Sequence, residues 1–316
     1  MRYAIIGGAG FIGSHFVDTL LAKEPSNEIV VVDNFSSGTR EHLLHHGGNP
    51  RLTIIEEDAL NTIELSRILV GVEKLILLAS NPDIARAVTQ PRIDFDQGTR
   101  IVESTIEASR ISGVKKVIFA SGSGVYGEVG ETLLAETSPL NPISTYGASK
   151  IAGEALLNAY SHMFGVEVLV FRFANVVGSR QTHGVGFDFI KRLQADPTHL
   201  RVLGDGLQSK SYIHVSDVVN AVLLMDRSTL KKVDCFNVST TDRITVNEIA
   251  ELAIECLELE IKKVNIQRTG GDRGWNGDVP LVNLDSTKLR SFGWNPSMTS
   301  TEAMKSALAS MAGKIH

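Results

Sequence analysis

The feature that most limits the possible folds is an alternation of short apolar runs with longer amphipathic stretches in the first half of the chain. The apolar runs lie at 3–7, 29–33, 52–56, 74–79, 117–121 and 166–173, and the stretches between several of them, at 11–23, 63–70, 92–111 and 146–164, have helical periodicity. Consecutive apolar residues suit strands that are buried on both faces. The alternation therefore predicts an α/β fold, a Rossmann-type doubly wound parallel sheet covered by helices on both sides.

Beyond residue 173 the pattern loosens and glycines become frequent, although helical patterns remain at 246–258 and 301–312. The length of 316 residues is compatible with two domains or one large one. Because no Pro- or Ser-rich linker marks a boundary, we predict a first domain over 1–173 and a smaller region over 174–316 that is interleaved with it.

Composition excludes several classes of function. The chain has 31 Lys and Arg against 36 Asp and Glu, a net charge of −5 with no basic run, which disfavours nucleic acid as a partner. Its two cysteines, Cys235 and Cys256, are too few for a disulfide scaffold or a cysteine zinc site, and they fit a reducing cytoplasm. No apolar run approaches the roughly 18 residues that cross a bilayer. We therefore expect a cytoplasmic protein without a membrane partner.

A glycine-rich turn follows the first predicted strand and opens the first predicted helix. Gly7, Gly10 and Gly13 permit a tight turn, a close backbone approach to a pyrophosphate and helix amides aimed at the anion. Asp33 ends the next strand, where a carboxylate accepts hydrogen bonds from ribose hydroxyls and repels a 2′-phosphate. The pattern predicts a site for NAD rather than NADP, with Asp58 after the third strand placed to meet the adenine amine.

Tyr146 and Lys150 stand four residues apart at the start of a predicted helix, so their side chains share one face. A tyrosine with a reference pKa of about 10 is a poor base at neutral pH. A lysine ammonium and a positively charged nicotinamide both favour the phenolate. The pair therefore predicts removal of a hydroxyl proton from a substrate while a hydride leaves the same carbon for NAD.

Together with other motifs, these residues resemble the extended short-chain dehydrogenase/reductase family, and within it the NAD-dependent nucleotide-sugar epimerases of the UDP-glucose 4-epimerase type. The similarity covers nearly the whole chain. Besides the glycine turn and the Tyr–Lys pair, its marks lie at 33–38, 121–127, 172–178, 204–208, 210–217 and 292–296.

The resemblance implies roles for further residues. It makes 1–173 the NAD-binding domain and 174–316 mainly the substrate-binding region. It adds to the NAD contacts, beside Tyr146 and Lys150, the residues Phe11, Ile12, Asn34, Ser37, Gly38, Ala59, Leu78 and Ala79. It implies that Asn175 contacts the sugar nucleotide, while Lys210 and Arg273 meet the phosphates.

The implied reaction interconverts UDP-glucose and UDP-galactose without net redox change. Tyr146 takes the proton of the 4-hydroxyl, the hydride moves from C4 to the nicotinamide, and the 4-keto sugar receives it back on its other face. The sequence leaves open an epimerase of UDP-N-acetylhexosamine or UDP-glucuronate, a reductase, or a non-catalytic NAD-binding protein. Val282 aligns where some family members carry a large aromatic residue that excludes N-acetyl groups, so we expect N-acetylated sugars to be accepted.

The chain departs from the family at Gly122, where a Ser or Thr usually helps the catalytic tyrosine to handle the substrate proton. Ser121 and Ser123 flank this position, and at the end of a strand at most one of them faces the site. We therefore expect one of the two to act in catalysis. Residues 122–124 also lack the carboxylates of the 4,6-dehydratases and of the decarboxylating relatives, which argues against both reactions.

Two surface patterns remain. His42, His45 and His46 have helix-like spacing, but no carboxylate or cysteine partner is evident, so we predict an exposed polar surface and no metal site. The helices predicted over 93–111 and 151–163 carry apolar residues beyond one face, namely Ile101, Val102, Thr105, Ile106, Ala152, Ala155, Leu156, Ala159 and Tyr160. This predicts a homodimer, which the resembled family forms through these two helices.

Overall fold

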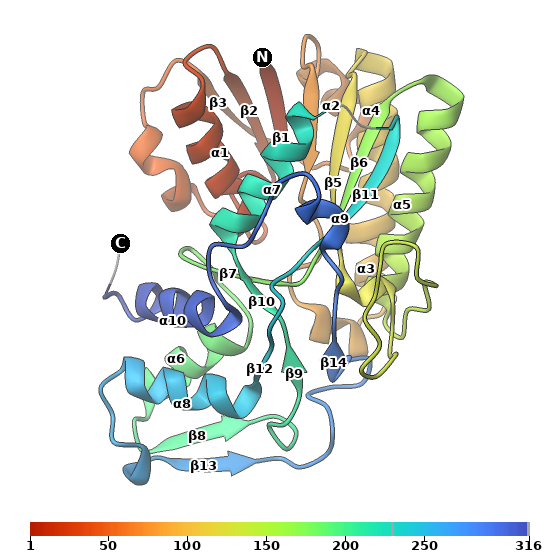
Figure 1. The fold of residues 1–316 in the computed structure, drawn as a ribbon. Coiled ribbons are helices and arrows are strands. Elements are labelled where there is room, and N and C mark those ends of the chain that lie inside the picture. The colour runs from red at the N-terminus through yellow and green to blue at the C-terminus, as the bar shows by residue number, and fades with distance from the viewer. Residues whose placement is uncertain (229–230, 315–316) are drawn as a thin grey trace. The chain divides into compact units, whose positions relative to one another are not determined.

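The computed structural model describes residues 1–228 and 231–314 (Figure 1). Its strands are β1 (Arg2–Ile6), β2 (Glu28–Asp33), β3 (Leu52–Glu56), β4 (Lys74–Leu77), β5 (Lys116–Gly122), β6 (Glu167–Phe173), β7 (Asn175–Val177), β8 (His199–Val202), β9 (Ser209–Lys210), β10 (Tyr212–His214), β11 (Val233–Val238), β12 (Ile244–Thr245), β13 (Asn265–Arg268) and β14 (Leu281–Val282). Its α-helices are α1 (Phe11–Lys23), α2 (Thr62–Ile68), α3 (Arg92–Asp94), α4 (Arg100–Ser112), α5 (Thr145–Phe164), α6 (Val185–Ala195), α7 (Val215–Arg227), α8 (Val246–Cys256), α9 (Thr287–Arg290) and α10 (Ser300–Met311). Shorter turns are η1 (Arg40–His46), η2 (Ile84–Val88), the π-helical η3 (Phe95–Thr99), η4 (Ser123–Val125) and η5 (Ile261–Lys263).

The chain divides into two compact units. The first comprises 1–125, 145–172 and 222–236, and the second comprises 126–144, 173–221 and 237–316. The chain passes from the first unit to the second between 172 and 173, next to the boundary predicted from the sequence. It also changes unit at the ends of the segments 126–144 and 222–236, and the sequence did not indicate these positions. The assignment of NAD to one region and substrate to the other stays a prediction. Across the described residues no helix is long and apolar enough to cross a membrane.

The first unit is built on a seven-stranded sheet with the order β11-β6-β5-β4-β1-β2-β3. β1 pairs in parallel with β2 and β4, and the pairs β2–β3 and β4–β5 are parallel too. This confirms the predicted doubly wound sheet. The strand order reverses at β1, so the connections that follow β1 and β4 leave in opposite directions, which is the position where open α/β sheets bind ligands.

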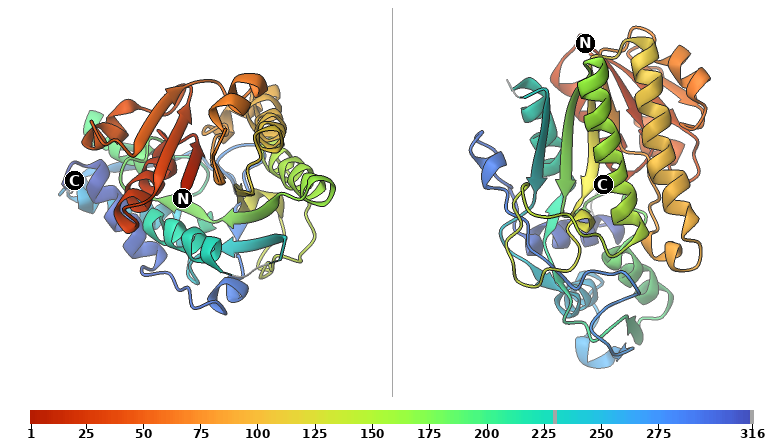
Figure 2. Two further views of the ribbon diagram at one scale, coloured as in Figure 1. Left: turned by 90° about the horizontal axis from the view of Figure 1, so that it is seen from above. Right: turned by 90° about the vertical axis from the view of Figure 1, so that its right-hand side faces the viewer.

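Helices cover both faces of this sheet (Figure 2). On one face α2, α4 and α5 bury alternate strand residues such as Ile6, Val32 and Phe119 in a continuous apolar core, while α1 lies on the opposite face. The strands are therefore buried on both sides, which explains why they are apolar at consecutive positions. The predicted strands and most predicted helices are present with ends shifted by at most two residues.

Two features of the helices differ from expectation. The helix predicted over 92–111 is interrupted by η3, where a Cβ on Gly98 would lie 2.5 Å from Ser149 Oγ of α5, so α5 approaches too closely for a side chain there. The apolar residues of α4 that suggested a partner subunit are buried in the unit's own core, because α4 packs between α2 and α5. They offer no surface to a second copy.

The second unit has its own core. α6, α8 and α10 pack together over the parallel pair β8–β13, and they bury residues such as Ile190, Ile249 and Leu308. β9 joins β12 and β14 in a small sheet, and β7 pairs with β10. The sequence pattern did not reveal α6 or α7 as helices. In α7 the valines at 215, 218, 219 and 222 resemble a strand, because β-branched residues favour strands, and packing overrides that preference.

Candidate functional site

The glycine turn lies between β1 and α1 and is closely packed. Gly7 has a positive φ of 83°, and a Cβ there would lie 2.8 Å from the backbone nitrogen of Ala79. A Cβ on Gly13 would lie 2.3 Å from the carbonyl oxygen of Gly7, so only glycine permits this approach of helix and turn. Gly10 is the N-cap of α1 and offers no side-chain cap, which leaves the first amides of the helix for an anion.

Asp33 is buried at the end of β2 and ties the second strand to the glycine turn. Its Oδ2 accepts the backbone N–H of Ala9 at 2.9 Å, and its Oδ1 accepts the N–H of Phe35 at 2.9 Å. Loss of hydration raises the pKa of Asp33, and the two backbone N–H groups oppose that rise. Each carboxylate oxygen keeps a second lone pair that a ribose hydroxyl can use.

The residues that follow β2 and β3 also meet. Asn34 Nδ2 donates to Asp58 Oδ2 at 3.2 Å, and the N–H of Leu60 donates to Asp58 Oδ1 at 2.9 Å. The structure thus brings Asn34 and Asp58 together beside Asp33. The glycines of the turn, which have no side chains, and the uncapped amides of α1 fit the pyrophosphate of a dinucleotide. The buried carboxylate at the end of the next strand fits its adenosine ribose.

Tyr146 and Lys150 occupy the first turns of α5, as predicted. Lys150 is buried, its Nζ donates to the carbonyl of Ala120 in β5 at 2.8 Å, and it lies 5.4 Å from the centre of the Tyr146 ring. Burial lowers the pKa of Lys150 to about 8, and the nearby Glu154 carboxylate opposes that fall. The ammonium is therefore held by the end of the sheet, beside the tyrosine.

Loss of hydration raises the pKa of Tyr146 to about 12, the Asp94 carboxylate adds to the rise, and a hydrogen bond with Ser80 opposes it. Ser80 comes three residues after β4, at the strand end where Ala79 lies against Gly7. The sequence analysis did not assign Ser80 a role, because a serine in a loop carries no signal of its own. Its position at the carboxyl end of a central strand is the clue that points to it.

The structure separates the two serines that flank Gly122. Ser121 Oγ donates to Glu154 Oε1 at 2.5 Å, and Arg172 binds the same carboxylate through Nε at 3.1 Å and Nη2 at 2.6 Å. The Ser121 hydroxyl is thus hydrogen-bonded to a buried ion pair. Ser123 lies half-buried in η4, the turn in which a Cβ on Gly124 would lie 4.0 Å from Cδ1 of Tyr146.

The predicted substrate residues all lie in the second unit. Asn175 begins β7 and forms a hydrogen bond with the Tyr212 hydroxyl. Lys210 Nζ donates to Asp278 Oδ1 at 2.5 Å, and Arg273 Nη2 pairs with Asp272 at 2.9 Å and Glu128 at 3.2 Å. Val282 lies opposite Lys210 in the pairing of β14 with β9. Both predicted phosphate ligands therefore have carboxylate partners in this structure.

The structure places a carboxylate beside two of the three clustered histidines, for which the sequence analysis found no carboxylate partner. His45 and His46 both contact Oδ1 of Asp18, a carboxylate that the sequence analysis did not find because it lies in α1, well away from them in the sequence. His42 instead contacts the carbonyl of Ala9 through Nδ1 at 2.9 Å. The three histidines are therefore not one uniform polar surface.

A glycine turn at a topological switch point, a buried acid at the next strand end and a Tyr–Lys pair on a helix define an α/β protein of the dinucleotide-dependent class. Comparison with known proteins narrows this class. The family model of the NAD dependent epimerase/dehydratase family matches residues 3–239, so the chain belongs to that family. This confirms the predicted family, the predicted fold class and NAD as the cofactor.

Individual relatives cover essentially the whole chain. A putative UDP-glucose 4-epimerase of Methanocaldococcus jannaschii is 30% identical over 307 residues, which is 95% of each protein. A crystal structure of a UDP-galactose 4-epimerase is 36% identical over 100% of both chains, with a TM-score of 0.87. The UDP-glucose 4-epimerase of Thermotoga maritima, solved with UDP-glucose, is 31% identical over 98% of both chains, with a TM-score of 0.86.

Proposed function

We propose that this protein is an NAD-dependent nucleotide-sugar 4-epimerase that interconverts UDP-glucose and UDP-galactose. The observation that carries the proposal is the Tyr146–Lys150 pair, held at the carboxyl end of the sheet in the same unit as the glycine turn. The relatives named above, which are UDP-glucose or UDP-galactose 4-epimerases, support this choice of substrate.

In this reaction Tyr146 takes the proton from the 4-hydroxyl of the sugar and later returns it to the 4-keto oxygen. The glycine turn and Asp33 would hold NAD, which would supply a reversible hydride acceptor for C4, so the reaction would have no net redox change. Lys150 supports the phenolate through its charge, while the Ala120 carbonyl fixes its position. Asp33 orients the adenosine ribose, and Gly7, Gly10 and Gly13 leave room for the pyrophosphate.

In the second unit, we assign Asn175 to the sugar nucleotide and Lys210 and Arg273 to its diphosphate. Each cation is paired with a carboxylate. Binding of the diphosphate therefore requires each cation either to leave its carboxylate or to contact the carboxylate and a phosphate together. Asp278 contacts both Lys210 and the backbone N–H of Gly274, the latter at 3.1 Å, and thereby connects β9 with the loop that carries Arg273. This arrangement suits a ligand that binds both segments at once.

A homodimer and a cytoplasmic location in galactose metabolism belong to the same proposal. Support for the dimer comes from α5, where Ala155, Ala159 and Met163 are exposed at spacings of four residues and form an apolar stripe. The right-hand view of Figure 2 shows α5 beside α4 on the same face of the sheet. Sedimentation equilibrium of the wild type and of Ala159→Arg tests the dimer.

Proton NMR of the purified protein with NAD and an equal mixture of UDP-galactose and UDP-N-acetylgalactosamine tests the activity. We expect both sugars to convert to their gluco epimers, because Val282 leaves room for an N-acetyl group. Conversion of UDP-galactose alone would contradict the expected substrate range and leave the epimerase standing. Conversion of neither sugar while NAD is bound would contradict the proposed function.

The hydrogen bond between Ser80 and Tyr146 predicts which hydroxyl serves the tyrosine in place of the one missing at Gly122. Ser80→Ala is expected to lower kcat by roughly 10²-fold, the effect typical of losing one positioned hydrogen-bonding group. KM is expected to change little, because Ser80 contacts the base. Ser123→Ala is the matched control, and steady-state kinetics with a larger loss in Ser123→Ala than in Ser80→Ala would reverse the assignment.

A further inference from the structure

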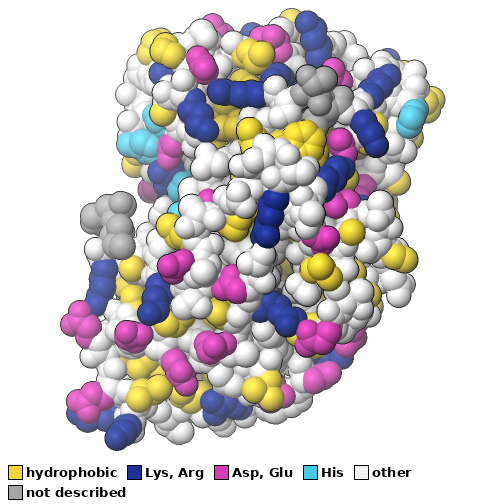
Figure 3. Space-filling model, viewed as in Figure 1, with side chains coloured by type: hydrophobic (Ala, Val, Ile, Leu, Met, Phe, Trp, Pro, Cys, Tyr) yellow, Lys and Arg dark blue, Asp and Glu magenta, His cyan; other side chains and the backbone are white. Residues whose placement is uncertain are grey.

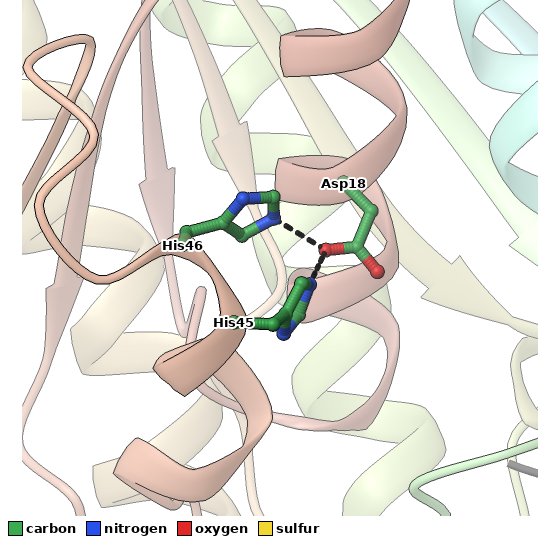
Figure 4. A group of neighbouring side chains, drawn as sticks. All are labelled: Asp18, His45 and His46. Carbon is green, nitrogen blue, oxygen red and sulfur yellow. Dashed lines mark hydrogen bonds and ion pairs between the residues drawn. The ribbon is translucent and has the colours of Figure 1, made fainter.

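Three side chains that are not among the predicted NAD and catalytic contacts have the composition of a transition-metal site. Asp18 lies in α1, and His45 and His46 are the last residues of η1. One ligand atom from each lies within 4.8 Å of the other two. Figure 4 shows both imidazoles turned toward the Asp18 carboxylate, and Figure 3 shows histidine side chains gathered at the surface beside α1.

Two of the three candidate ligand pairs share one carboxylate oxygen. Nε2 of His45 lies 2.8 Å from Asp18 Oδ1, and Nε2 of His46 lies 2.7 Å from the same oxygen. Ligands about 2.0–2.1 Å from a tetrahedral zinc are roughly 3.3 Å apart, so an ion would lengthen each of these two nitrogen–oxygen contacts by about half an ångström. The side chains of His45, His46 and Asp18 are 48%, 16% and 28% exposed, which gives them room for that movement.

We propose that Asp18, His45 and His46 form a binding site for Zn²⁺ or a divalent transition metal of similar chemistry. Two imidazoles and one carboxylate suit zinc, cobalt and nickel, whereas Mg²⁺ and Ca²⁺ prefer ligand sets made only of oxygen. Three protein ligands complete a tetrahedral site with one water molecule, and the partial exposure of the cluster admits both the ion and the water.

The site joins η1 to α1 next to the predicted adenosine contacts. η1 begins two residues after Gly38, and it is already attached to the glycine turn through the N–H of Thr39, which donates to the Ala9 carbonyl at 3.1 Å, and through His42. The contacts of His45 and His46 with Asp18 form a third attachment, between the end of η1 and the middle of α1, and a bound ion replaces them with metal–ligand bonds. It therefore stabilises the folded first unit by mass action and restrains η1 in particular.

Titration of the full chain tests the proposal, with any polyhistidine tag removed and the protein first treated with a chelator. Calorimetry with ZnCl₂ is expected to show one ion per chain, and CoCl₂ is expected to produce a visible absorption band of a four-coordinate site. Asp18→Asn, His45→Gln and His46→Gln are each expected to weaken binding by at least about 10-fold. His162→Gln, at an exposed histidine near the end of α5, is the matched control and is expected to bind as the wild type does.

Hydrogen exchange locates the ion independently of affinity. Zinc is expected to slow amide exchange over 40–48 in the wild type and in His162→Gln, but not in His45→Gln. His45 is the most exposed of the three ligands, so its replacement tests the site without disturbing the core. Binding that survives all three ligand substitutions, or zinc that leaves exchange over 40–48 unchanged, would overturn the proposal. None of these measurements depends on epimerase activity.

Discussion

Tyr146→Phe is expected to lower kcat by roughly 10²–10⁴-fold while the protein keeps its NAD. In the proposed mechanism this substitution removes the hydroxyl that exchanges a proton with the sugar, and general acid–base catalysis contributes rate factors of about this size. Loss of hydration raises the pKa of Tyr146 to about 12, so this hydroxyl resists ionisation by itself. The adjacent Lys150 charge and the positive nicotinamide therefore have to favour the phenolate during turnover.

The matched control is Tyr160→Phe on the same helix. The Tyr160 hydroxyl contacts Glu107 Oε2 at 3.3 Å and serves no predicted catalytic role, so this variant is expected to retain the wild-type kcat. Steady-state kinetics gives the rates, and the absorbance of NAD released on denaturation gives the cofactor content. A Tyr146→Phe enzyme with substantial kcat, or equal losses in the two variants, would contradict the role assigned to Tyr146.

Glu154→Leu is expected to destabilise the protein by about 3–5 kcal/mol. Glu154 and Arg172 form a buried pair, with side chains only 12% and 6% exposed, and removal of one partner leaves an uncompensated buried charge. That loss is a large fraction of the stability of an ordinary domain. It also frees Ser121 and removes the carboxylate that opposes the fall in the pKa of Lys150, so kcat is expected to decrease as well.

The pair Glu107–Arg110 provides the comparison, because its side chains are 27% and 38% exposed. Exposed pairs contribute at most about 1 kcal/mol, so Glu107→Gln is expected to shift the urea midpoint only slightly. The double variant Glu154→Leu/Arg172→Met is expected to recover part of the lost stability, because it removes the unpaired cation. Equal midpoint shifts in Glu154→Leu and Glu107→Gln would show that the buried pair has no special importance.

Much of the first unit could be predicted from the sequence, because local patterns determine it. Strands buried on both faces are apolar at consecutive residues, and the contact that requires a glycine at position 13 lies within the turn itself, with the carbonyl oxygen of Gly7. The Tyr–Lys pair is equally local, since four residues on one helix suffice to define it.

The features that sequence analysis missed depend on contacts between distant segments. Ser80 meets Tyr146 only because the ends of β4 and α5 come together, and Asp18 meets His45 and His46 only because η1 packs on α1. The hydrogen bond from Ser121 to Glu154 also joins two segments that are distant in the sequence. The interruption of the predicted helix at Gly98 likewise follows from the close approach of α5, which no local pattern encodes.

The most direct test of the central claim, a reversible hydride transfer without net redox change, is the fate of deuterium placed at C4 of UDP-galactose. The enzyme with its NAD is incubated with this substrate in ordinary water, and the UDP-glucose formed is analysed by NMR and mass spectrometry. Our account predicts that the product retains the deuterium at C4 and that the NAD content is unchanged. Replacement of the deuterium by hydrogen from water, or a net accumulation of NADH, would contradict it.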